Sequence, residues 1–236
     1  MEGLVITIQD KLKDWAKDTA AAYHKLANEN EACNRAFYTQ SDLSKLNTYP
    51  ELLILGINPK GNCKYDYPID ENGYMGQIQN EKWGIPNGMT GENLLKGNSF
   101  ECDKCNWPIW NPVKILFEKA GALDMLAEGN HAYSNMVLYE TPCEKDIPEK
   151  AWSLLSQTFA LIDILQPKYI LCLGKKNAME RLIAKDSCEE VLPEMLYKGQ
   201  YKQSTVLGLP HPSRNAWSKH YEVLAQEVRK IIEQSE

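Results

Sequence analysis

Apolar and polar positions along the chain switch between a helical period and short continuous apolar runs, which predicts alternating helices and strands. About the first 25 residues read as a helix with one apolar face, made by Ile8, Leu12, Trp15, Ala16, Thr19 and Tyr23. Apolar runs predict buried strands over residues 51–57, 133–138, 168–174 and 204–209. Amphipathic patterns predict helices over 111–119, 148–165, 176–184 and 216–234, the first ended by Gly121. Ser41 is expected to cap a short helix that ends at Leu46.

Strands that alternate with helices predict an α/β protein. We expect a three-layer α/β/α sandwich around a central, mainly parallel four-stranded sheet, in a single domain that covers residues 1–236. Residues 1–46 form its helical N-terminal part. The pattern is lost over residues 61–111, which are rich in Gly, Asn, Pro and aromatic residues. A long aromatic-rich loop in a compact domain is typical of an ordered, substrate-facing excursion, with one short helix near residues 90–96.

Composition adds limits on partners and compartment. A net charge of −6 argues weakly against a protein that coats nucleic acid through charge alone. No signal peptide or membrane span is expected, and seven cysteines without a secretory signal indicate reduced thiols in the cytoplasm. Cys172, inside a strand-like run, is expected in the core. Basic residues near the strand ends are either solvated or phosphate-facing: Lys60, Lys64, Lys175, Lys176, Arg214 and Lys219.

The first candidate motif follows the strand predicted at 51–57 and reads Gly56-Ile57-Asn58-Pro59-Lys60-Gly61. Pro59 biases Asn58 toward extended geometry, which holds the amide at the strand end. A neutral amide is a poor general base, but its oxygen can accept a hydrogen bond from a water and aim that water at an electrophilic carbon. The alternative is a plain Asn-Pro turn.

The second motif follows the strand predicted at 204–209 and reads Pro210-His211-Pro212-Ser213-Arg214-Asn215. A rigid His211 suits donation of a hydrogen bond to an oxygen that gains negative charge, or else it binds a loop carbonyl. Ser213 and Arg214 suit phosphate or a base stack, and Ser213 or Asn215 can also cap the closing helix. Because parallel strands end at one edge of a sheet, Asn58 and His211 are expected at one site.

Two further features carry chemistry. Asn135 lies inside the strand predicted at 133–138, where a polar amide needs a partner. Its donor and acceptor match the edge of an imide such as uracil, or they tie down a loop. Cys102 and Cys105 form one Cys-x-x-Cys pair, whereas a structural zinc site commonly uses two such pairs. No metal or organic cofactor is expected.

The two motifs together resemble those of the uracil-DNA glycosylase superfamily, and most of all its single-strand-selective monofunctional branch. The shared positions are Gly56-Ile57-Asn58-Pro59, then Met75-Gly76-Gln77, Trp83-Gly84 and His211-Pro212-Ser213 in the same order. Lys60 departs from the family pattern, and the second motif lacks one proline. The resemblance implies that Asn58 positions the attacking water, that His211 stabilises the departing base, and that Asn135 reads the base edge.

The resemblance also implies a substrate pocket and a DNA contact. The pocket residues would be Gly56, Ile57, Met75 and Gly76, with Trp83 or Tyr74 stacked on the base. The DNA contact would come from Lys60, Ser213, Arg214 and Asn215. The sequence therefore predicts a DNA base-excision glycosylase that acts on DNA containing uracil or a related damaged base, with no membrane partner. The alternative is an inactive protein of the same fold that binds a nucleotide, nucleic acid or protein partner.

Overall fold

The computed structural model describes residues 6–29, 37, 39–60, 78–80, 85–87, 95, 109–212 and 216–235. The chain divides into two compact units. The first unit comprises Met1–Tyr49, Ile57–Ser99 and Ala132–Leu165, and the second comprises Pro50–Gly56, Phe100–His131 and Gln166–Glu236. Each unit is built from segments that lie far apart in the sequence.

The main sheet has six strands in the order β4-β1-β5-β8-β7-β6. Its strands are β1 (Leu52–Gly56), β4 (His131–Asn135), β5 (Tyr169–Leu173), β6 (Glu189–Leu192), β7 (Leu196–Tyr201) and β8 (Ser204–Leu209). The four expected strands are present, and the sheet is mixed where we expected a mainly parallel one of four strands. The α/β class is therefore confirmed, and β6 and β7 are additional.

Within the second unit, β1, β5 and β8 form a parallel core. β5 pairs in parallel with β1 on one side, where Leu52 lies opposite Tyr169, and in parallel with β8 on the other, where Tyr169 lies opposite Thr205. β1 and β5 are buried at every position, which explains their continuous apolar sequences. The ladder continues one step further, since the Gly174 amide donates to the Leu209 carbonyl at 2.8 Å. These three strands consequently end at the same edge.

The hairpin of β6 and β7 extends this core. β7 runs antiparallel to β8, and β6 runs antiparallel to β7. Its sequence gives little strand signal, because β6 is largely exposed and both strands carry charged or small polar residues. Gly199 and Gly208 admit close packing, since a Cβ would lie 2.2 Å from Ile183 Cδ1 and 2.3 Å from Met179 Sδ respectively. Tertiary packing, rather than a local pattern, therefore places this hairpin.

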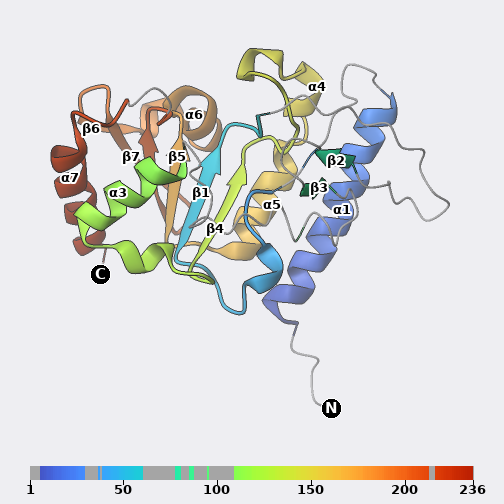
Figure 1. Ribbon diagram of the computed structural model, residues 1–236, viewed down its shortest axis with the longest axis horizontal. Coiled ribbons are helices and arrows are strands. Elements are labelled where there is room, and N and C mark those ends of the chain that lie inside the picture. The colour runs from blue at the N-terminus through green and yellow to red at the C-terminus, as the bar shows by residue number, and fades with distance from the viewer. Residues whose placement is uncertain are drawn as a thin grey trace. The chain divides into compact units, whose positions relative to one another are not determined.

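Helices α3 (Trp110–Ala120) and α7 (Tyr221–Glu233) lie side by side in the second unit (Figure 1). Gly121 adopts a left-handed φ of 74° and ends α3, as the sequence predicts. A salt bridge of 2.5 Å joins Lys119 to Glu222 across the two helices. The unit also contains a π-helical turn over Lys175–Met179 and the short helix α6 (Glu180–Leu182), where the sequence predicts one α-helix. The closing helix begins later than expected, because residues 216–220 form turns.

In the first unit, α1 (Ile8–Glu29) packs on α5 (Leu155–Leu165). All six residues of the predicted apolar face of α1 are buried. The indole of Trp15 donates to the Gln157 carbonyl at 2.7 Å, and the Thr19 hydroxyl donates to the Gln157 side chain at 2.9 Å. The single helix expected over 148–165 is instead α4 (Glu149–Trp152) followed by α5. The buried face of α5 centres on Thr158, Leu161, Ile162 and Leu165.

Smaller elements complete the first unit. A 3-10 helix covers Leu43–Lys45, and its cap is Asp42 rather than Ser41, because the Asp42 carboxylate accepts from the Ser44 amide. The Ser41 hydroxyl instead accepts from the Tyr133 amide at 2.6 Å. Within the predicted excursion, β2 (Ile78–Asn80) and β3 (Ile85–Asn87) form an antiparallel pair. The helix expected near residues 90–96 lies outside the described residues, apart from residue 95.

Candidate functional site

The chain that leaves β1 is held along the chain that leaves β4. The Ile57 carbonyl accepts from the Val137 amide at 3.0 Å, and the Pro59 carbonyl accepts from the Thr141 amide at 3.2 Å. Lys60 and Thr141 form a parallel bridge. Pro59 has no amide hydrogen, so it contributes only its carbonyl to this pairing. Asn58 therefore sits on a backbone that is fixed on both sides, within the first unit.

The Asn58 side chain is clamped through its nitrogen. Nδ2 lies 2.8 Å from the Pro59 carbonyl oxygen, 2.8 Å from Thr141 Oγ1 and 3.3 Å from the Tyr139 carbonyl oxygen. The two carbonyl oxygens can only accept, so the amide nitrogen must face them. Among the described residues, no donor reaches Oδ1, and the side chain is half-buried. Its oxygen is consequently presented as an acceptor for a water or a ligand.

Asn135 is the last residue of β4 and is 2% exposed, as the sequence predicts for a polar residue in a buried strand. Its side-chain Nδ2 has no hydrogen-bond partner within the described part of the chain. A buried amide donor that lacks a partner costs about 1–3 kcal/mol, so Asn135 is a candidate for contact with a ligand. Asn135 and Asn58 both belong to the first unit.

Buried polar groups that the sequence did not single out accompany Asn135. The side-chain oxygens of Gln40 and Ser134 have no partner in the described ranges, and the side chain of Glu140 is fully buried. Gln40 lies beside β4, because its amide donates to the Tyr133 carbonyl at 3.1 Å. Thr141 was missed as well, since nothing in its local sequence predicts a contact with a residue so distant in the chain.

His211 lies in the second unit, directly after β8. The indole of Trp217 donates to the Pro210 carbonyl at 2.9 Å and so holds the loop. Residues 210–212 form neither helix nor strand, as the flanking prolines predict, and His211 is half-buried. The carboxyl ends of β1 and β8 lie at the same edge of the parallel core. The expected approach of His211 to Asn58 stays a prediction.

Lys175 follows β5 at this edge and is already engaged. Its ammonium lies 3.5 Å from the centroid of the Tyr197 ring, a cation–π contact. The Tyr197 hydroxyl donates a hydrogen bond to Glu190 at 2.6 Å, and this hydrogen bond raises the pKa of Tyr197. The Glu194 amide and the Tyr197 hydroxyl together lower the pKa of Glu190. This network belongs to the hairpin, so we assign Lys175 no role at the strand ends.

Of the other residues predicted for the site, some lie in the described part of the chain and some lie outside it. Gly56 is buried, Ile57 is half-buried, and Lys60 is exposed beside Asn58. Several expected residues lie outside the described part of the chain: Tyr74, Met75, Gly76, Trp83, Ser213, Arg214 and Asn215. Their roles stay predictions.

The described ranges contain no group of three or more His, Cys, Asp or Glu side chains placed to hold a metal ion. Cys102 and Cys105 lie outside these ranges. Cys172 is fully buried on β5, which confirms its place in the core, and this burial raises its pKa.

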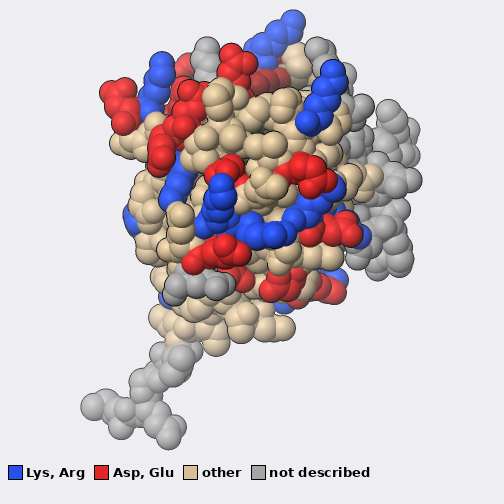
Figure 2. Space-filling model, turned by 90° about the vertical axis from the view of Figure 1, so that its left-hand side faces the viewer, with Lys and Arg blue, Asp and Glu red and all other residues tan. Residues whose placement is uncertain are grey.

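The charged surface of the second unit bears on the expectation of a DNA partner. Figure 2 shows one face of the second unit, on which basic and acidic side chains are intermixed. In the second unit, Lys119 pairs with Glu222, and Lys230 pairs with Glu227. Among the described residues of this face, the Lys and Arg side chains do not form a continuous basic surface of the kind that binds a DNA backbone.

No protein-family model and no curated protein sequence matches this chain. None of the helices in the described residues has the length and apolar content that a membrane crossing requires.

Proposed function

We propose that the protein is a monofunctional glycosylase that hydrolyses the bond between deoxyribose and uracil or a related damaged base in DNA. The observation that carries this proposal is the clamped amide of Asn58 at the end of a buried parallel strand. Its nitrogen faces protein oxygens 2.8 Å away, and its oxygen is left as an acceptor. Such an acceptor orients a water without removing its proton.

The chemistry needs three groups. Asn58 Oδ1 accepts a hydrogen bond from the water whose oxygen bonds to C1′ of the sugar. The bond between C1′ and the base nitrogen breaks, and its electron pair leaves with the base. His211 donates a hydrogen bond to a base oxygen and stabilises the resulting anion. The water proton passes to solvent, and no metal or organic cofactor takes part.

Asn135 supplies base recognition in this proposal. Its buried Nδ2 donor would bind a carbonyl oxygen of the base, while its Oδ1 would accept from an imide N–H. Burial makes a mismatched base costly, because the donor then stays without a partner. Met75, Gly76, Trp83 and Tyr74 would complete the base pocket, and Ser213, Arg214 and Asn215 would contact DNA. In the fold that accompanies this proposal, β4, β1, β5 and β8 form the centre of a three-layer α/β/α sandwich in one domain.

The test is excision of uracil from labelled single- and double-stranded oligonucleotides. Wild type should cut, while Asn58→Ala and His211→Ala should each lose at least about a hundredfold in rate. His220→Ala is a matched control, because His220 is exposed and makes no side-chain cap bond at the start of α7. Folded wild type that leaves uracil, hydroxymethyluracil and hypoxanthine intact in both substrates would contradict the proposal.

A second function is supported by Lys60, whose exposed side chain follows Asn58 by two residues. A long cation there can hold a phosphate without any reaction. An inactive protein of this fold would then bind a nucleotide, a nucleic acid or an acidic protein segment. Oligonucleotide binding that is weakened by Lys60→Gln, together with absent excision, would select this alternative.

A further inference from the structure

The Thr141 hydroxyl donates one hydrogen bond and accepts another, and its two partners fix which is which. Thr141 Oγ1 donates its single hydrogen to the Cys143 carbonyl oxygen at 2.8 Å. Its remaining capacity is acceptance, and the donor at 2.8 Å is Asn58 Nδ2. The hydrogen bonds therefore run from Asn58 to Thr141 and on to Cys143, and this direction fixes which end of the amide faces inward.

We infer that Thr141 is a positioning residue that holds the Asn58 amide with its oxygen outward, and that position 58 is built for an amide and against a carboxylate. The orientation is a property of the first unit by itself. Its catalytic meaning rests on the glycosylase proposed above, where the outward oxygen holds the water.

The rejection of a carboxylate follows from the oxygens around Nδ2. The Pro59 carbonyl, the Tyr139 carbonyl and Thr141 Oγ1 all present lone pairs to this atom. A carboxylate oxygen in the same place would meet two carbonyl oxygens that cannot donate. Thr141 could donate to it only by giving up the Cys143 carbonyl. The two hydrogens of an amide nitrogen can be shared among these three acceptors, with the shorter bonds at 2.8 Å to the Pro59 carbonyl and Thr141 Oγ1, so an amide is the group that suits position 58.

Two matched variants of the full chain test the inference. Thr141→Val keeps the shape and burial of the side chain but removes the hydroxyl, whereas Thr141→Ser keeps the hydroxyl. The first readout is the exchange with solvent of the Asn58 side-chain NH₂ protons, followed by NMR and assigned through Asn58→Ala. The second readout is the rate of uracil excision, separated into kcat and KM.

We expect protected Asn58 NH₂ protons in wild type and in Thr141→Ser, and faster exchange in Thr141→Val. Loss of one hydrogen bond of ordinary strength corresponds to a fall in kcat on the order of tenfold for Thr141→Val, with KM little changed. Thr141→Ser should restore kcat. A residue that only stabilised the fold would leave kcat unchanged below the unfolding temperature.

The outcomes separate this inference from the proposed function. If wild type excises no base but the NH₂ protection follows the hydroxyl, the positioning role stands and the glycosylase proposal fails. If Thr141→Val keeps both the NH₂ protection and kcat within twofold of an active wild type, the positioning role is overturned. Unprotected NH₂ protons in wild type itself also overturn it, even if Thr141→Val does not fold.

Discussion

The buried hydroxyl of Thr158 lies 2.9 Å from the Met136 carbonyl oxygen and 3.3 Å from that of Asn135. One side chain of α5 therefore fixes the backbone at the end of β4. The Asn135 side chain on this fixed backbone keeps an Nδ2 donor without a partner among the described residues. A rigid support beneath an unsatisfied group is the arrangement expected where a ligand, rather than the protein, completes the hydrogen bonding.

Asn135→Leu is expected to leave the free energy of unfolding unchanged or to raise it by about 1 kcal/mol, because it removes a buried donor without a partner. The same substitution should abolish discrimination between bases if Asn135 reads the base edge. Urea unfolding and excision of uracil against cytosine measure the two effects.

Thr158→Val is the companion to that variant and should lower the free energy of unfolding by about 1–2 kcal/mol, since it removes a buried donor to two carbonyls. A large loss of stability in Asn135→Leu would show that the amide is structural and would remove Asn135 from the recognition role.

Asn58→Asp is expected to destabilise the protein in a pH-dependent way. The oxygens around position 58 disfavour the charged carboxylate, so its pKa in the folded state should rise above its unfolded value of about 4. A raised pKa means that stability is retained below the unfolded pKa and lost as the pH rises through the folded one. The deficit relative to wild type should therefore be small near pH 4 and reach about 1–3 kcal/mol at pH 7.

Urea unfolding of Asn58→Asp between pH 4 and pH 8 measures this deficit. Asn58→Ala serves as the control, because it has no titrating group at this position and should show a pH-independent deficit. A deficit of Asn58→Asp that shrinks as the pH rises would contradict the cage of acceptor oxygens.

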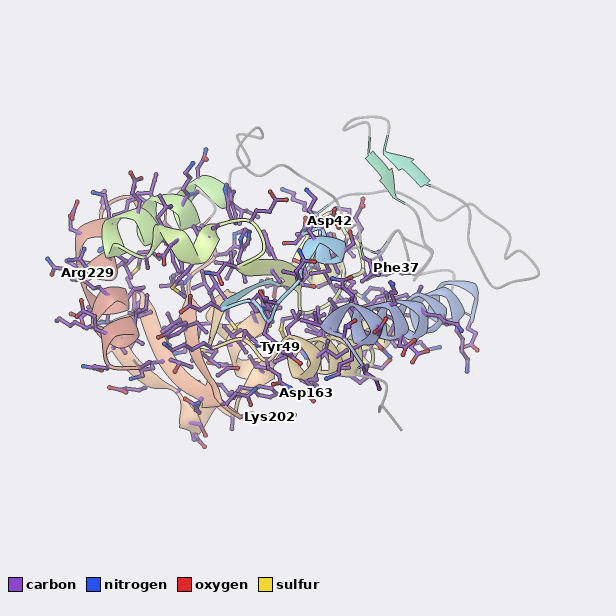
Figure 3. The ribbon with its side chains drawn as sticks, turned by 90° about the horizontal axis from the view of Figure 1, so that it is seen from below. Phe37, Asp42, Tyr49, Asp163, Lys202 and Arg229 are labelled. Carbon is purple, nitrogen blue, oxygen red and sulfur yellow. The ribbon has the colours of Figure 1, made fainter. Side chains whose placement is uncertain are left out.

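Arg229 of α7, labelled in Figure 3, caps the end of α3 through two hydrogen bonds. Its Nε donates to the Ala120 carbonyl at 2.9 Å, and its Nη2 donates to the Lys119 carbonyl at 2.8 Å. Arg229→Met should cost about 1–2 kcal/mol of unfolding free energy, because the last carbonyls of α3 lose two charge-assisted donors. Thermal unfolding measures this effect. Lys230→Met, at an exposed ion pair with Glu227, should change stability by less than about 0.5 kcal/mol.

Cys143 is exposed, and its thiol donates to Asp146 at 2.8 Å. This hydrogen bond is the main reason that the pKa of Cys143 is raised. Because the thiolate is the reactive form, alkylation of Cys143 should begin at a higher pH than for an ordinary exposed cysteine. Asp146→Asn should move the alkylation profile to lower pH. Peptide mapping of iodoacetamide labelling resolves Cys143 from the other cysteines, and an unchanged profile would argue against the Asp146 contact.

Strong local signals account for the elements that the sequence predicted. Continuous apolar runs gave β1, β5 and β8, because both faces of these strands are buried. Gly121 marked the end of α3, since its φ of 74° suits glycine. The sequence did not predict the hairpin of β6 and β7, because neither strand has an alternating apolar pattern of its own. The hairpin joins the sheet through the pairing of β7 with β8.

In the candidate site, too, residues with a local sequence signal could be predicted, and residues that matter through tertiary contacts could not. Asn135 could be singled out because a polar amide within a buried strand is unusual, and Asn58 because Gly56-Ile57-Asn58-Pro59 resembles a known motif. Thr141 could not be found, since its importance comes from a side-chain contact with Asn58 that no periodicity encodes. Ser41 was assigned as a cap on residue type alone. Its hydroxyl binds the Tyr133 amide instead, and this leaves the cap to Asp42.

The interleaving of the two units has a consequence for synthesis on the ribosome. The first unit is complete once the chain reaches Leu165, whereas the second needs segments up to Glu236. β1 belongs to the second unit, and its in-register partner β5 begins only at Tyr169. A nascent chain of about this length would carry a finished first unit and an apolar β1 with β4 available on one side, while the edge that later pairs with β5 is still open and prone to aggregation. β1 is therefore the stretch for which a chaperone would matter most, until β5 and β8 emerge.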